Sequence, residues 1–291
     1  MLALERLLFA REEAVGAAKR RKAEIDRLKA LPREQQEAYQ ALRADERIIE
    51  QGIDIEGDPE AQVTALARVL AHKFQSGIEA GDLDEPTSYL LTKAQRTLAK
   101  LADVPVACKK GCSHCCNIWV SASVPEIFYL AKLLRGQASG REMAVRKAHA
   151  ATEPYTHEQR PYHPFPCGFL ENNECSIYEH RPVACRLASS GDAEICARSY
   201  NNITDENIPT SVAYLMAREG VSLSLLIALQ KAGLPQEQYE LNAALVTALD
   251  TDDAERRWLA GEDIFAGVKQ DPGGLKDLPE VAHLYKRAFP A

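Results

Sequence analysis

The stretch Cys108-Lys109-Lys110-Gly111-Cys112-Ser113-His114-Cys115-Cys116 decides how this 291-residue chain is organised. The chain has eight cysteines, and all of them lie between residues 108 and 196. Cysteines this close in sequence rarely form disulfides with one another, because the bond requires a specific separation of the two backbones. Clustered thiols are instead typical ligands of a thiophilic metal. The candidate ligands are Cys108, Cys112, Cys115, Cys116, Cys167, Cys175, Cys185 and Cys196.

Eight thiols fit two kinds of metal centre. A structural zinc takes four ligands in a closed tetrahedron, so eight cysteines make two zinc sites with none left over. An iron–sulfur cluster also takes four thiolates, so two clusters, or one cluster and one zinc, would use the same residues. Because Cys115 and Cys116 are adjacent, their side chains diverge in most backbone conformations, so they serve different metals or one of them bridges. The spacing does not reproduce the ferredoxin string Cys-x₂-Cys-x₂-Cys-x₃-Cys-Pro, and zinc tolerates irregular spacing, so zinc is the first choice.

Charged residues beside the cysteines have a physical role in either centre. Two zinc ions leave the charge of eight thiolates only partly neutralised. Arginine is suited to compensating the remainder, because its charge is permanent and its donors are planar. The candidates for this role are Lys109, Lys110, Arg181 and Arg186. The histidines His114, His163 and His180 lie near the cysteines but are less favoured as ligands than the thiols.

Several motifs in this part of the chain resemble those of the YkgJ-type cysteine cluster proteins, a family described as a zinc- or iron-chelating domain. The similar strings are Gly111–Cys116, Cys167–Leu170, Cys175–Arg186 and Cys196–Arg198, and they occur in the same order as in the family. The family opens with Cys-x-x-Cys, whereas three residues separate Cys108 from Cys112 here. The resemblance covers about residues 104–200 and implies metal binding, without an established reaction.

Composition narrows the class of protein and its compartment. The formal net charge is −7, which argues against a protein that binds nucleic-acid phosphates. Glu5 and Arg6 interrupt the apolar N-terminus, so we expect no secretory signal. No stretch reaches the roughly 18 apolar residues of a membrane span. We therefore expect a cytoplasmic protein that binds neither nucleic acid nor membrane, in a compartment where cysteine clusters indicate metal or redox chemistry.

Periodicity outside the cysteine segment predicts a mainly α fold, a helical scaffold around an irregular cysteine-rich metal-binding centre with few short strands. Asp58 and Pro59 predict one helix start, and Ser123 with Glu126 predicts a capping box at another. The expected helices cover residues 59–80, 87–101, 123–136, 141–151, 209–219, 221–232, 235–250 and 254–260. Short strands are expected at Asn117–Ser121 and Ser176–Tyr178.

Two parts are predicted along the chain. Residues 1–52, rich in Ala, Glu, Arg and Lys, form a helical N-terminal extension that could contact a protein partner. Residues 53–291 form a helical domain that contains the cysteine core at about 104–200.

No enzymatic signature accompanies the cysteines. The sequence has no glycine-rich nucleotide loop, no Gly-x-Ser-x-Gly and no His-Glu-x-x-His. A metal-binding protein with a structural or interaction role is therefore favoured over an enzyme. The alternative is an iron–sulfur redox protein or a protein-modifying enzyme, because flagellin lysine methylases share a similar cysteine signature.

Overall fold

A computed structural model describes residues 29–51, 58–136, 140–200, 204, 206–273 and 275–290. The chain divides into two units, Met1–Arg47 and Ile48–Ala291. Helix α2 (Arg33–Gln51) is the part of the expected N-terminal helix that the structure describes, and the rest of that prediction, residues 1–28, lies outside the described residues. The boundary expected near residue 52 stays a prediction.

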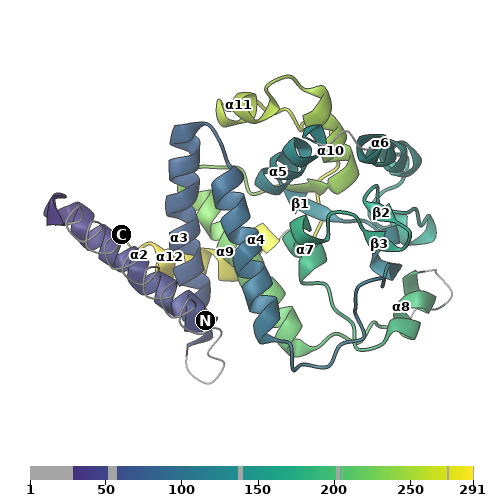
Figure 1. Cartoon of the computed structure of the whole chain (residues 1–291), viewed down its shortest axis with the longest axis horizontal. Coiled ribbons are helices and arrows are strands. Elements are labelled where there is room, and N and C mark those ends of the chain that lie inside the picture. Colours follow the sequence, from purple (N-terminus) through teal and green to yellow (C-terminus); the bar gives the residue numbers. More distant parts are fainter. Residues whose placement is uncertain are drawn as a thin grey trace, which may run out of the picture. The chain divides into compact units, whose positions relative to one another are not determined.

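The second unit is built of helices with two short antiparallel strand pairs, which confirms the predicted mainly α class (Figure 1). Its helices are α3 (Pro59–Ala80), α4 (Asp84–Lys100), α5 (Val124–Arg135), α6 (Arg141–Thr152), α7 (Val183–Arg186), α8 (Ala193–Tyr200), α9 (Val212–Ala232), α10 (Leu241–Asp250), α11 (Ala254–Leu259) and α12 (Pro279–Ala288). The strands are β1 (Ser121–Ser123), β2 (Leu170–Glu171), β3 (Glu174–Cys175) and β4 (Gln238–Glu240), and the 3-10 turns are η1 (His114–Asn117), η2 (Arg160–Tyr162), η3 (Tyr178–His180) and η4 (Leu275–Asp277).

Helix α3 begins as the sequence predicts. The Asp58 carboxylate accepts hydrogen bonds from the backbone N–H groups of Glu60 (3.2 Å) and Ala61 (3.1 Å), and Pro59 is the first helical residue. These two bonds satisfy N–H groups that have no partner inside the helix. The helix ends at Gly81, whose φ of 71° is the left-handed conformation that glycine adopts without a steric penalty.

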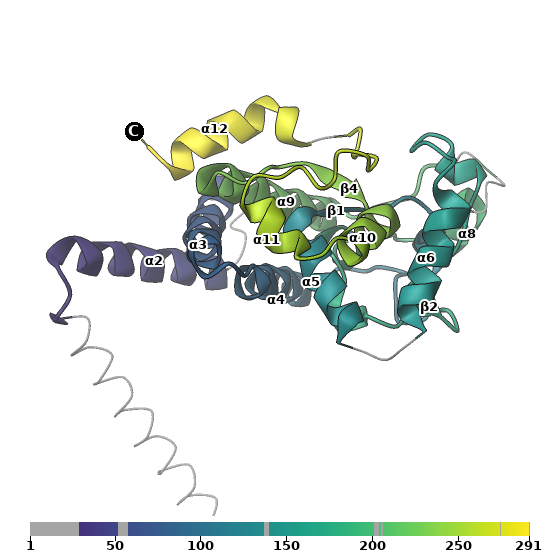
Figure 2. The ribbon, with the colours of Figure 1, turned by 90° about the horizontal axis from the view of Figure 1, so that it is seen from above.

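Helices α3 and α9 form the centre of the scaffold, with α4 beside α3 (Figure 2). Gly220 lies at the crossing of the two helices, where a Cβ atom would make ordinary contact with the Val63 side chain (3.4 Å). Ser224 donates a hydrogen bond to the Val63 carbonyl oxygen (3.0 Å) at the same crossing. Two separate helices, 209–219 and 221–232, were expected, and that division is wrong because Gly220 is a contact point inside one continuous helix.

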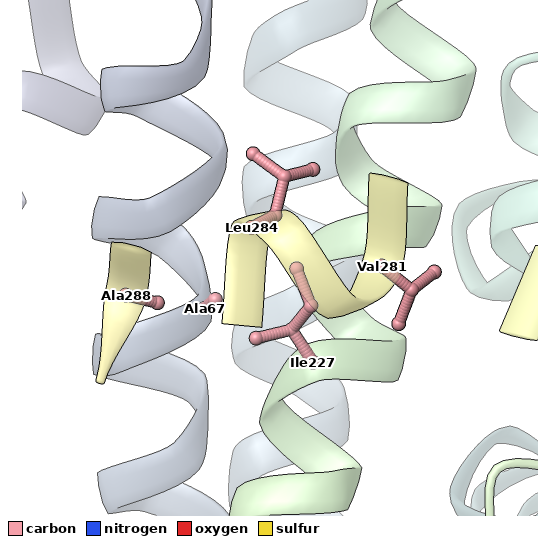
Figure 3. Packing of buried hydrophobic residues seen from close by; sticks show 5 residues of the cluster. All are labelled: Ala67, Ile227, Val281, Leu284 and Ala288. Carbon is pink, nitrogen blue, oxygen red and sulfur yellow. The ribbon is translucent and has the colours of Figure 1, made fainter. Parts of the chain in front are cut away.

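Helix α12 closes this core from the C-terminal end of the chain. Its apolar residues Val281, Leu284 and Ala288 meet Ala67 of α3 and Ile227 of α9 (Figure 3). Ala67 and Ile227 are both fully buried. The sequence interpretation missed this helix, although Pro279 at its first turn and the apolar spacing that follows are a recognisable signal.

Helix α9 is long and apolar enough, by length and composition alone, to cross a membrane. Half of its most apolar window is buried inside the protein, and Leu225–Leu229 are in the core. Core helices of globular proteins pass the same length and hydropathy test, and the packing of α9 against α3 is of that kind.

A second layer of helices carries the cysteine segment. Helix α10 packs on α5 and α6, and β1 pairs with β4 in antiparallel register, with Ala122 opposite Tyr239. The expected helix over 235–250 is wrong in its first turn, because Gln238–Glu240 pair with β1 instead. The expected strand at Asn117–Ser121 is also misplaced, since Asn117 ends the turn η1 and pairing begins only at Ser121. Likewise, Glu174–Cys175 pair with β2 where Ser176–Tyr178 were expected to form a strand.

Candidate metal centre

Backbone hydrogen bonds bring the first cysteine of the segment next to the last. Ala107 donates its N–H to the carbonyl oxygen of Ser190 (2.8 Å). Ser190 in return donates its N–H to the sulfur of Cys108 (3.2 Å), and its hydroxyl donates to the carbonyl oxygen of Asp192 (2.9 Å), which also accepts the N–H of Cys196 (3.3 Å). Ser190 therefore holds Cys108 near the start of the helix that carries Cys196, 88 residues further along the chain.

A second set of backbone bonds brings Cys116, Cys167 and Cys175 together. Cys167 donates its N–H to the carbonyl oxygen of Cys116 (2.7 Å). The β2–β3 pair places Leu170 opposite Cys175, so the turn after Cys167 folds back on Cys175. The backbone N–H groups of Phe169 and Ile177, each two residues further on, lower the pKa of Cys167 and of Cys175 against the larger effect of burial. Such N–H donors stabilise a thiolate, which is the form of cysteine that binds metal.

Cys185 is positioned by a buried carboxylate. It lies on the short helix α7, whose first N–H group, that of Val183, donates to Glu126 (2.8 Å). The other oxygen of Glu126 accepts the backbone N–H of Ser123 (3.0 Å) and its hydroxyl (2.7 Å). The predicted capping box of α5 is thus confirmed, and the same side chain also caps α7. No local pattern predicts this second role, because Val183 is 57 residues away in sequence.

Gly168 allows the loop at Cys167 to lie directly against helix α6. A Cβ atom at this position would come within 2.5 Å of the Val145 Cα atom, so no larger residue fits without moving the backbone. The loop is therefore located by packing against the scaffold as well as by its hydrogen bonds.

These tethers converge on one cavity of about 300 Å³. Seven of the eight predicted ligands line it, namely Cys108, Cys112, Cys115, Cys116, Cys167, Cys175 and Cys185. Cys196 does not line the cavity but is buried beside it, and all eight cysteines are free of disulfides. Apolar side chains complete the wall, among them Leu98, Phe169 and Leu241. Thiol donors in an apolar wall are the environment that suits zinc or iron, so the residues present fit a metal.

The cavity is wider than a single closed tetrahedral site. Among the described residues, which include all eight cysteines, no three sulfurs lie within 4.8 Å of one another. Closing four sulfurs around one ion therefore requires the loops to draw together, or the space is shared by more than one metal.

The thiols hold their protons more tightly than ordinary cysteines. Burial raises the pKa of Cys167 to about 11, and burial also raises the pKa of Cys185 well above its usual value. The hydrogen bond with Cys116 and then burial raise the pKa of Cys115. The negative charges of neighbouring thiolates add to each shift. A metal binding here must displace these protons, so its affinity rises with pH.

Arg181 and Arg186 line the cavity, as expected for charge compensation. The Arg181 guanidinium stacks 3.7 Å over the ring of Tyr178 and donates its Nε–H to the Tyr178 carbonyl oxygen (3.1 Å). Held in this way, its positive charge lowers the pKa of Cys175 and Cys185 against the larger effect of burial. Lys109 also lines the cavity, while Lys110 forms an ion pair with Glu174 (3.2 Å).

The histidines have other partners or positions in the described structure. His180 Nδ1 forms a hydrogen bond with the Tyr129 hydroxyl (2.8 Å), and His163 stacks on Tyr155 with ring centres 3.8 Å apart. His114 lies in η1 between the first cysteines, but neither it nor the other two histidines is among the residues that line the cavity. This agrees with the preference for thiol ligands.

A separate acidic cluster lies on the scaffold, formed by Asp82, Asp84 and Glu255. Lys132 donates to all three carboxylates at 2.7–2.9 Å. The lysine ammonium group supplies the positive charge that such a cluster requires, so the cluster is an ion-pair network that joins α4, α5 and α11.

One protein-family model matches the part of the chain that contains the cysteines. Residues 107–207 match the family model CxxCxxCC, described as "Putative zinc- or iron-chelating domain". Cys108, Cys112, Cys115 and Cys116 fit its motif, so the resemblance found in the sequence is confirmed over this segment. This part of the chain is similar to domains of the zinc- or iron-chelating class, which supports metal binding. No curated protein and no solved structure matches the chain.

Proposed function

We propose that the cysteine cavity binds zinc and that the metal has a structural role, holding the segment 104–200 on the helical scaffold. The single observation that carries this proposal is the convergence of seven free cysteines on one cavity. Zinc has no electronic preference for a geometry, so it suits ligands delivered by loops of irregular spacing. A metal that joins loops in this way contributes its binding free energy to folding.

Metal analysis tests the proposal directly. Protein purified without oxygen is analysed for zinc and iron, and its absorption spectrum is recorded. Zinc bound in stoichiometric amount to a colourless protein supports the proposal. A preparation with neither metal, in which all eight thiols react freely with a thiol reagent, would contradict it.

Iron–sulfur chemistry is the second candidate, and the width of the cavity favours it. A polynuclear cluster fills more space than one ion, and no three sulfurs are close enough to enclose a single ion as they stand. A brown preparation that contains acid-labile sulfide would decide for this candidate, and an electron-transfer role would then replace the structural one.

An interaction role through residues 1–52 is proposed in addition. Helix α2 is amphipathic in sequence, and helical extensions of this kind commonly bind partner helices. Deletion of residues 1–52 tests it: the shortened chain should keep its metal and lose any partner captured by the full chain.

Free thiols in the cluster agree with the proposed cytoplasmic location, since that compartment is reducing.

A further inference from the structure

The tethers described above sort the cysteines into two groups. Ser190 hydrogen-bonds to the Cys108 sulfur and to the backbone of Asp192, whose carbonyl oxygen accepts the N–H of Cys196, and helix α8, which carries Cys196, packs on η1 close to Cys112 in sequence. This first group is called the outer triad, defined as Cys108, Cys112 and Cys196. Cys167 and Cys175 are joined through the β2–β3 turn, and Cys185 lines the same cavity from helix α7, which packs on β1. This second group is called the inner triad, defined as Cys167, Cys175 and Cys185.

The adjacent pair Cys115–Cys116 lies between the triads. The Cys116 carbonyl oxygen accepts the N–H of Cys167 of the inner triad (2.7 Å), and the turn η1, which contains both residues, packs on α8 of the outer triad. Cys115 and Cys116 both line the cavity. Each triad lacks one ligand for a closed tetrahedron, and the pair offers two sulfurs.

The two triads differ in how firmly they are held. The inner triad is fixed three times over, by the packing of Gly168 on α6, by the backbone pairing of Leu170 with Cys175 and of Ser176 with Phe169, and by the Glu126 cap of α7. The outer triad is held mainly through Ser190, and its Cys108 is exposed, whereas its Cys196 is buried. Ligands fixed by a second layer of hydrogen bonds bind metal about 10–100-fold more tightly than unsupported ones.

We propose that the cysteine cluster holds two unequal metal sites: an inner permanent site on Cys167, Cys175 and Cys185, and an outer exchangeable site on Cys108 and Cys112 together with Cys196, which is buried beside the cavity. Cys115 and Cys116 supply the fourth ligand of each. The outer site is the one at which metal enters and leaves. This inference rests on the proposed function, because it requires that the cavity binds metal.

Chelator competition on the full chain loaded with zinc tests the proposal. We expect two zinc ions per chain, released to a coloured chelator in two equal phases, the second at least about tenfold slower than the first. Cys108→Ser should abolish the fast phase, leave the slow one and keep the far-ultraviolet circular dichroism. Cys175→Ser is the matched variant, and it should abolish the slow phase.

If Cys175→Ser fails to fold, alkylation of the wild-type protein replaces it. With one equivalent of zinc added to metal-free protein, Cys108 and Cys112 should be modified before Cys175 and Cys185, as read by mass spectrometry. Release of all metal in one phase, or loss of both ions in Cys108→Ser, would overturn the two-site inference while leaving metal binding intact. A protein that takes up no metal at all would instead overturn the proposed function.

Discussion

The α3–α9 core and the cysteine segment are held together by different physics. The core consists of long capped helices whose buried residues, such as Leu70 and Ile227, are fully removed from water. The cysteine loops, residues 108–120 and 167–190, contain short turns and two-residue strands, and most of their residues are at least partly exposed. Burial of apolar surface accounts for the stability of the first region. The second lacks such a core, so ligands and backbone tethers must supply what burial does not.

Withdrawal of metal should produce the largest difference between the two regions. A structural zinc contributes on the order of 10 kcal/mol of binding free energy to the segment that it holds. Treatment with a strong chelator should therefore abolish hydrogen-exchange protection over the cysteine loops, residues 108–120 and 167–190, while α3 and α9 keep theirs. Re-addition of zinc is the control and should restore protection. Unchanged protection in the metal-free protein would mean that the segment folds without its ligands.

Ile227→Ala should produce the reverse pattern: the α3–α9 core loses stability and the metal content stays the same. Removal of a fully buried isoleucine side chain leaves a cavity and should cost about 2–5 kcal/mol of the free energy of unfolding. Metal content per folded chain should not change, because Ile227 does not line the cysteine cavity. Val212→Ala, at an exposed position of the same helix, is the control and should be almost neutral. A loss of metal in Ile227→Ala would show that the two regions are coupled.

Glu126→Gln should affect the scaffold and the cysteine loops moderately, because Glu126 caps α5 of the scaffold and also α7, which carries Cys185. A glutamine offers one acceptor oxygen, so either Ser123 or Val183 is left with an unpaired buried N–H, at a cost of about 1–3 kcal/mol. Denaturant unfolding should register this cost, and release of metal to a chelator should become faster, since α7 carries Cys185. Glu142→Gln on the surface is the control. A stability loss with unchanged metal release would separate the cap from the metal site.

The smallest expected effect lies in the acidic network around Lys132. Hydrogen bonds from Lys132 and from the N–H of Asp84 lower the pKa of Asp82 below 3.8. A lowered folded-state pKa stabilises the protein above pH 3.8, and this stabilisation is lost as the pH falls through the lowered value. Asp82→Asn should therefore lower the free energy of unfolding at pH 7 by no more than about 1 kcal/mol, because the pair is partly exposed. The difference in stability between the variant and the wild type should disappear in strong acid. A difference that persists at the lowest pH would show that charge is not its origin.

The sequence predicted those elements whose signals are local. Asp58 with Pro59 and Ser123 with Glu126 marked two helix starts correctly, because a cap depends on residues within one turn. The cysteine set was also recognisable, since seven of its members do share a cavity. Strand β4 was missed because three residues that pair with β1 carry no period that distinguishes them from the helix that follows.

The grouping of the cysteines depends on contacts between distant residues. Ser190 joins Cys108 to Cys196, and nothing in its local sequence indicates that it lies opposite Ala107. In the same way, Gly168 is required by the backbone of Val145, which only the tertiary structure brings to it. Features that depend on two segments meeting could not be predicted from either segment alone.

The pairing of β1 with β4 has a consequence for how the protein is made. All eight cysteines have been translated by residue 196, whereas α9 begins at Val212 and β4 ends at Glu240. At about 5–20 residues per second, the ribosome takes on the order of seconds to produce the segment that separates Cys196 from Glu240. During that interval the nascent chain carries its complete set of thiols, but helix α9, which packs on α3, and strand β4, which pairs with β1, have not been completed. The thiols are thus available to metal, and to oxidants, before the scaffold can close around them.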